Sequence, residues 1–123
     1  MRVFLSLATL LALGCAGTPP PTAPEPIERF NVGLLEVGSA SVEVGPAGPQ
    51  LLIKSGGVPC LRVGDVTQWR DGAVINVRVE SYWNAPVCIL LLKNLEHTVV
   101  LEGPFPPGEY VVRANGVEVR FRI

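Results

Sequence analysis

The sequence predicts an all-β protein, folded as a single antiparallel sandwich of two sheets. The final stretch, residues 110–123, alternates apolar and polar residues around an Asn-Gly pair, which is the pattern of a β-hairpin. Glycine and proline are abundant, with 13 and 12 residues, and turn signals recur at intervals that suit short strands. No stretch beyond residue 27 favours a helix, so strands must supply the core.

The length and charge of the chain indicate a single domain that does not bind nucleic acid. A chain of 123 residues is long enough for one domain with a real core. The formal net charge is −1, and no basic patch or aromatic-basic interleaving indicates a nucleic-acid partner. We therefore expect no nucleic acid among the ligands.

Residues 1–14 have the features of a secretion signal. Arg2 is followed by the apolar run 3–13, which is shorter than the roughly 20 residues that a membrane-spanning helix needs. The run ends in Leu-Ala-Leu-Gly-Cys at residues 11–15. This ending resembles the lipobox of bacterial lipoprotein precursors, in which a small residue precedes an obligatory cysteine. The family prefers leucine three positions before the cysteine, whereas this chain has Ala12 there and Leu13 next to it.

The resemblance implies that Cys15 becomes a lipidated N-terminus, anchored to a membrane by its acyl chains. Residues 16–26 are rich in proline, which suits a stiff tether between a membrane and a domain. Ala16 is not the aspartate that the family uses for inner-membrane retention, so the outer membrane is favoured where there are two. The domain would then lie in the periplasm or at the cell surface. An ordinary cleaved signal with an incidental cysteine is the alternative.

Residues 27–123 form the predicted domain. The first expected strands are residues 31–37, 41–44 and 50–54, with a loop at 45–49. Residues 61–69 and 73–82 form a hairpin around Asp71-Gly72. Its first strand changes apolar phase, which a β-bulge at Gly64-Asp65 would repair; a wider turn at 69–72 is the competing explanation.

The continuously apolar run Val87–Leu92 predicts a central strand buried on both faces. Residues 98–101 form another strand, and the proline-rich residues 102–108 lead into the final hairpin. In that hairpin the turn fixes the register. The expected cross-strand pairs are Ala114 with Val117, Val112 with Val119, Tyr110 with Phe121, and Arg113 beside Glu118.

The segment from Leu101 to Val112 contains Pro107-Gly108-x-Tyr110-x-Val112. It resembles the entry to a late strand in immunoglobulin-like, fibronectin III-like and carboxypeptidase-regulatory-like modules. The resemblance implies an immunoglobulin-like sandwich and a tyrosine corner, in which the Tyr110 hydroxyl bonds to the preceding connection. It implies no function, because these modules serve many.

If Cys15 is lipidated, Cys60 and Cys88 remain. An even count in an exported protein predicts one disulfide, with two buried free thiols as the alternative. A redox pair is disfavoured because the chain has no Cys-x-x-Cys motif.

Catalytic signals are weak. His97 is the single histidine, and no ligand spacing around it indicates a metal site. No serine lies in a Gly-x-Ser-x-Gly elbow, and the carboxylates are scattered. We therefore expect no cofactor, no metal and no enzyme, with an unseen hydrolase as the weakest option.

Three aromatic residues are candidates for binding. In an antiparallel layout the loops at 82–86 and 103–107 share one end of the domain and present Tyr82, Trp83 and Phe105 on a proline-stiffened backbone. The competing interpretation is that they cap the core. The sequence thus predicts a non-catalytic envelope lipoprotein that binds an envelope protein or plays a structural part. The alternative is a glycan- or peptide-binding accessory or a small-ligand carrier.

Overall fold

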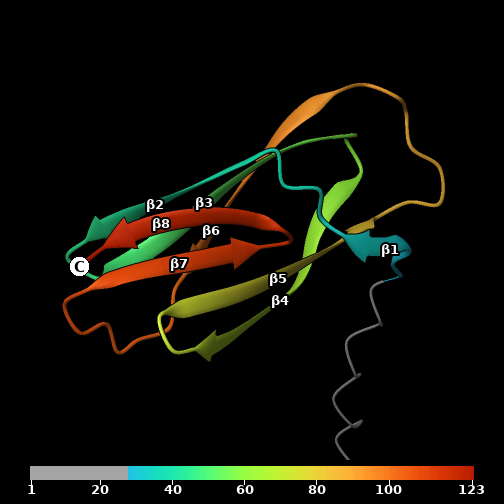
Figure 1. Cartoon of the computed structure of the whole chain (residues 1–123). Coiled ribbons are helices and arrows are strands. Elements are labelled where there is room, and N and C mark those ends of the chain that lie inside the picture. Colours follow the sequence, from blue (N-terminus) through green and yellow to red (C-terminus); the bar gives the residue numbers. More distant parts are fainter. Residues whose placement is uncertain (1–27) are drawn as a thin grey trace, which may run out of the picture.

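The computed structural model describes residues 28–123, which form two facing β-sheets (Figure 1). The predicted all-β sandwich is confirmed. The leader, Cys15 and the spacer 16–26 lie outside the described residues. The strands are β1 (Phe30–Leu34), β2 (Ser39–Gly45), β3 (Gly48–Gly57), β4 (Leu61–Asp71), β5 (Val74–Trp83), β6 (Lys93–Val100), β7 (Glu109–Ala114) and β8 (Val117–Arg122). Within this part of the chain, no helix is long and apolar enough to cross a bilayer.

Strand β5 is the centre of the larger sheet. β4 pairs along one of its edges, while β1 and β7 share the other edge, and β8 pairs with β7. The β5–β7 pair is parallel, so the expectation of a wholly antiparallel sandwich is wrong at this point. The reason lies in the connection, because between β5 and β7 the chain crosses to the other sheet and returns.

The smaller sheet has the order β2-β3-β6, and all its pairs are antiparallel. Its first hairpin turns at residues 46–47, so the loop predicted over 45–49 is too wide. Pro49 is a buried strand residue near the beginning of β3, a position that proline tolerates. β3 also continues through Gly57, beyond its predicted end at Lys54.

The core lies between the two sheets. Its buried residues come from both layers and are Leu35, Leu51, Ile53, Ile75, Val77, Val79, Val99, Leu101, Tyr110, Val112 and Ala114. Burying one such aliphatic side chain contributes roughly 1.5–3 kcal/mol, so this cluster dominates the stability of the sandwich. No core residue comes from the connection between β5 and β6.

The final hairpin has the predicted register. Tyr110 pairs with Phe121, and Val112 pairs with Val119. Asn115 and Gly116 have φ values of 48° and 89°, as a type I′ turn requires. On the outer face, Arg113 Nε lies 2.8 Å from a Glu118 carboxylate oxygen.

The side chain of Asn115 also forms hydrogen bonds that link the β7–β8 turn to β5 and to the end of β1. Its Nδ2 donates to the carbonyl oxygens of Leu35 (2.7 Å) and Val79 (2.8 Å), and its Oδ1 accepts from the Val79 amide (3.0 Å). These bonds satisfy backbone groups at the point on the β5 edge where β1 ends and β7 ends. The asparagine that suits the type I′ turn therefore also satisfies backbone groups of the larger sheet between the ends of β1 and β7.

The predicted β-bulge in β4 is confirmed. Val63 pairs with Ser81 and Val66 pairs with Val79, which leaves Gly64 and Asp65 opposite a single β5 residue. The wider turn is not needed, because strand pairing continues to Asp71. The extra residue restores the inward phase of the valines, as the sequence pattern requires.

The predicted strand at 87–92 is wrong. Residues 84–92 are an irregular connection from β5 in one sheet to β6 in the other. Both edges of β5 are already occupied by β4, β1 and β7, and β6 begins only at Lys93. The apolar run therefore cannot pair along β5, and the chain uses it to cross from the larger sheet to the smaller one.

Candidate functional site

The connection before β6 carries the most exposed apolar surface in the described chain. We call Val87–Leu92 the apolar loop. The exposed fractions of its aliphatic residues are 82% for Val87, 74% for Ile89, 91% for Leu90, 57% for Leu91 and 88% for Leu92. Single exposed apolar residues are ordinary, but a contiguous set marks a contact surface.

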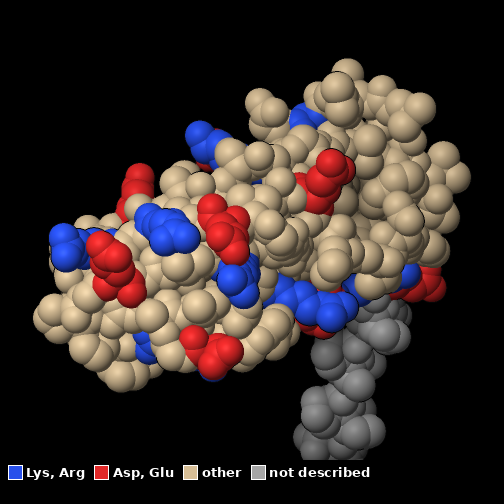
Figure 2. Space-filling view, in the orientation of Figure 1, with Lys and Arg blue, Asp and Glu red and all other residues tan. Residues whose placement is uncertain are grey.

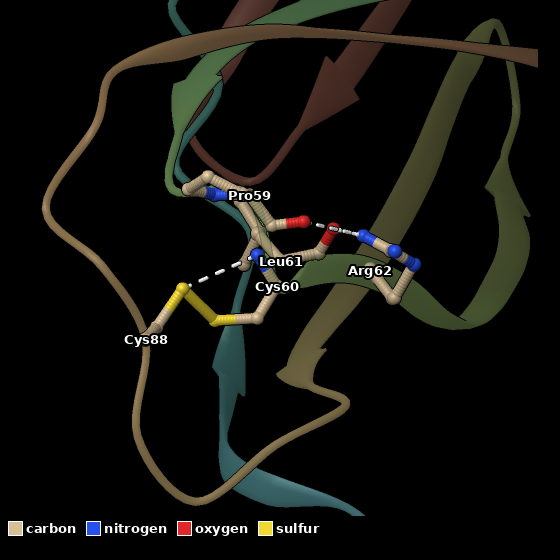
Figure 3. Close-up of a disulfide and its surroundings, with 5 residues drawn as sticks. All are labelled: Pro59, Cys60, Leu61, Arg62 and Cys88. Carbon is tan, nitrogen blue, oxygen red and sulfur yellow. Dashed lines mark hydrogen bonds between the residues drawn. A yellow bond between two sulfur atoms is a disulfide. The ribbon is translucent and has the colours of Figure 1, made fainter.

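A disulfide fastens the apolar loop to the sandwich. Cys60, buried directly before β4, is bonded to Cys88, as predicted, and their Cα atoms lie 5.9 Å apart. The Asn84 amide donates to the Cys60 carbonyl oxygen at 3.0 Å, and the Cys60 amide contacts Cys88 Sγ at 3.2 Å. Figure 3 shows the loop running past this attachment. The chain is therefore held at Asn84, before the apolar loop, and at Cys88 within it, while Ile89–Leu92 remain exposed.

The segment that forms the loop end carries no charge, although the Arg29–Asp65 ion pair lies beside its root. The chain contains no Asp, Glu, Lys, Arg or His from Ser81 to Leu92. Figure 2 shows charged side chains mainly over the rest of this face and few at the outer rim of the loop end. Cations lie at its base. Lys93 follows the loop directly, and Arg62 Nη1 donates to the carbonyl oxygens of Pro59 and Leu61, both at 2.8 Å (Figure 3).

Tyr82 and Trp83 lie at the root of the apolar loop. Both are half-buried at the end of β5. The Arg29 guanidinium lies 4.5 Å from the centre of the Tyr82 ring, and Phe30 of β1 pairs with Trp83. The described chain therefore begins beside the loop root, as Figure 1 shows.

Phe105 does not join these two aromatics, so the predicted shared aromatic end is wrong. Its ring packs edge-on against Tyr110 at 5.6 Å and Phe121 at 6.2 Å, and Arg70 covers it at 4.7 Å. Arg70 also donates to the Pro104 carbonyl oxygen. The parallel β5–β7 pair is the cause, because it places the entry to β7 beside the entry to β5.

The predicted tyrosine corner is present. The Tyr110 hydroxyl donates to the Pro106 carbonyl oxygen, four residues back in the connection. The Tyr110 ring stacks on Phe121 with centroids 5.3 Å apart. This corner and the Phe105 cluster together close the end of the core opposite the apolar loop.

A comparison with family models identifies this sandwich. Residues 55–123, more than half of the chain, match the model of the ORF11 β-sandwich domain. The chain belongs to this family. The match begins near the end of β3 and includes both disulfide cysteines, the apolar loop and the tyrosine corner. No curated protein and no solved structure gives a significant match.

His97 lies within β6 of the ORF11 β-sandwich domain, opposite Ile53 of β3. It is half-buried in the middle of the strand. In the part of the chain that the structure describes, no three His, Cys, Asp or Glu side chains are grouped to hold a metal ion.

The domain has two recesses that bear on binding. The larger, about 630 Å³, is lined entirely by the β7–β8 hairpin, so it is a surface groove rather than a space between the sheets. Its lining residues are Glu109, Tyr110, Val111, Arg120, Phe121 and Arg122. A smaller recess of about 210 Å³ lies near the base of the apolar loop, between Pro59 and Lys93.

The apolar loop is recognisable in the sequence as a continuous apolar run, but its composition predicts a core strand. Two signals could have placed it outside. The turn at 84–86 interrupts the chain before it, and pairing of Cys60 with Cys88 fixes its second residue beside the beginning of another strand. The candidate site is therefore an exposed aliphatic loop on a disulfide-braced frame, with Tyr82 and Trp83 at its root.

Proposed function

We propose that this chain is a lipid-anchored lipoprotein of the bacterial envelope, whose sandwich acts through contacts rather than through chemistry. The apolar loop carries the proposal. Each aliphatic side chain left in water forgoes roughly 1.5–3 kcal/mol of burial free energy. Five of them on one loop suit a surface that another component of the envelope covers, either a protein or the membrane itself.

The anchor rests on the sequence around Cys15. The small residue Gly14, the cysteine and the proline-rich residues 16–26 together fit a lipidated N-terminus followed by a spacer. Ala16 favours the outer membrane over the inner one in a cell with two. The sandwich would then lie in the periplasm or at the cell surface, where a disulfide is stable.

Metabolic labelling with a fatty-acid analogue tests the anchor. We expect the unaltered chain to take up the label and Cys15→Ser to lose it. The double variant Cys60→Ser/Cys88→Ser is the matched control and should keep the label. An unlabelled parent chain contradicts the lipoprotein assignment.

The groove on the β7–β8 hairpin supports a second candidate, a carrier of small ligands or peptides. Its volume of about 630 Å³ falls in the range of small-molecule sites. Screening glycans and peptides by thermal shift, with Phe121→Ala to remove one wall, separates this function from the first. A ligand that stabilises the parent but not the variant favours the carrier.

A further inference from the structure

We propose that the apolar loop inserts its side chains into a lipid bilayer and holds the loop end of the sandwich against the membrane. The inference deepens the proposed function and rests on it for the identity of the membrane. The insertion itself is argued from the loop, its borders and its position.

The chemistry of the loop favours lipid over protein. Its exposed residues are all aliphatic: Val87, Ile89, Leu90, Leu91 and Leu92. Protein interfaces depend on tyrosine, tryptophan and arginine, and leucine and valine are under-represented among their energetic centres. Acyl chains offer no hydrogen-bond partners, and this loop presents no polar side chain that would need one.

The depth of insertion follows from the backbone. Between Val87 and Leu92 one hydrogen bond closes within the loop, from the Leu91 amide to the Ile89 carbonyl oxygen at 2.9 Å. Unpaired backbone groups do not enter the hydrocarbon region. We therefore place the loop backbone among the hydrated headgroups and only the aliphatic side chains in the acyl layer.

The borders of the loop fit this depth. Lys93 comes directly after Leu92, and Arg62 lies at the base of the loop near Cys60. Lysine and arginine favour the headgroup level, where anionic lipids attract them. Trp83 and Tyr82, half-buried at the root, are the residue types enriched at membrane interfaces.

The position of the loop agrees with the anchor. Phe30 pairs with Trp83 at the loop root, so the N-terminal segment joins the sandwich at this end (Figure 1). Glu28 is thirteen residues after Cys15 (28 minus 15). A chain of that length spans at most about 45 Å when fully extended. A lipid on Cys15 therefore tethers the sandwich by its loop end and leaves the apolar loop within reach of the membrane.

Quenching of an added tryptophan tests the insertion. The full chain with Trp69→Phe and Trp83→Phe is the background, and Leu90→Trp adds a fluorophore at the most exposed loop position. A second variant, Leu92→Trp, covers the case in which one substitution disturbs folding. Val44→Trp is the control, because Val44 is 53% exposed in β2 and lies near the turn at the opposite end of the sandwich. Each protein is reconstituted in vesicles of phosphatidylethanolamine and phosphatidylglycerol with brominated acyl chains.

We expect loss of emission for Leu90→Trp and Leu92→Trp, and none for Val44→Trp. Equal emission from all three variants overturns the inference. Shielded, blue-shifted emission that is unchanged by brominated lipid overturns it too, because it places a protein or residues 3–13 of this chain on the loop.

The same variants made with Cys15→Ser separate this inference from the lipid anchor. Fatty-acid label on the parent without quenching leaves the anchor standing and the insertion wrong. Quenching that persists with Cys15→Ser, when the parent takes up no label, leaves the insertion standing and the anchor wrong.

Discussion

Two apolar stretches of this chain differ in burial: one lies in the core and the other is exposed. In the final hairpin, Tyr110, Val112 and Ala114 alternate with residues that point outward, and all three are buried. In the apolar loop, the aliphatic residues follow one another without alternation and are exposed. The apolar character of a segment indicates only that its removal from water is favourable. Alternation that matches across a turn indicates in addition that the segment is buried in the core of its own domain.

The two ends of the sandwich differ in the same way. At the tyrosine-corner end, aromatic rings contact one another and Arg70 covers them, so that surface is already satisfied. At the loop end, the aliphatic side chains have no such cover. The tyrosine-corner end therefore contributes to stability, and the loop end is available for contact with a partner.

The largest effect on the free energy of unfolding is expected at the tyrosine-corner end. Tyr110→Ala removes a buried ring, its stacking on Phe121 and its bond to Pro106, and should lower the free energy of unfolding by about 3–5 kcal/mol. Tyr110→Phe removes only the hydroxyl bond and should cost about 0.5–1.5 kcal/mol. Urea denaturation measures both. Equal losses for the two variants would argue that the ring contributes nothing.

The disulfide joins the two regions, and its removal should have the next largest effect. Because the cysteines are 28 positions apart in sequence, Cys60→Ala/Cys88→Ala should lower the free energy of unfolding by roughly 3–4 kcal/mol through loop-closure entropy. Mass analysis after alkylation without reductant checks the bond itself. Modification of both thiols in the unreduced protein contradicts it.

Substitutions of Asn115 test whether its side-chain hydrogen bonds stabilise the larger sheet. Asn115→Gly keeps the positive φ but loses three side-chain hydrogen bonds, and should cost about 1–3 kcal/mol. Asn115→Ala should cost about 1 kcal/mol more, because alanine disfavours the left-handed region. Thermal and urea unfolding resolve the order. If glycine were as stable as asparagine, the side-chain bonds would have no energetic role.

The smallest effect on stability is expected in the apolar loop. Leu90→Ala should change the free energy of unfolding by less than about 0.5 kcal/mol, because Leu90 is exposed. The same substitution at the fully buried Leu51 should cost about 2–5 kcal/mol. Comparable losses at the two sites would move the loop into the core and remove the candidate site.

The sequence was sufficient wherever the signal was local. The Asn115-Gly116 turn fixed the final register, and the change of phase around Gly64 predicted the bulge. Both follow from backbone sterics within a few residues. The same holds for the tyrosine corner, whose hydroxyl reaches only four residues back.

The sequence was insufficient wherever distant pairing decided the outcome. An antiparallel layout predicts the wrong end of the domain for Phe105, because the parallel β5–β7 pair joins strands far apart in the chain. The composition of Val87–Leu92 predicts a core strand and carries no sign that both edges of β5 are occupied by other strands. The candidate site was thus visible as residues but not as a surface.

Vesicle titration tests the central claim most directly. In the full chain with Cys15→Ser, the lipid concentration for half-maximal binding is compared among the otherwise unaltered chain, Leu90→Glu/Leu92→Glu and the control Val44→Glu/Val100→Glu. Val44 and Val100 are exposed apolar residues outside the apolar loop. The loop variant should need at least about tenfold more lipid, since charges replace two exposed leucines that would enter the acyl layer, and the control should match the unaltered loop. Equal shifts for the two variants, or no shift for either, would contradict a loop built to contact the membrane.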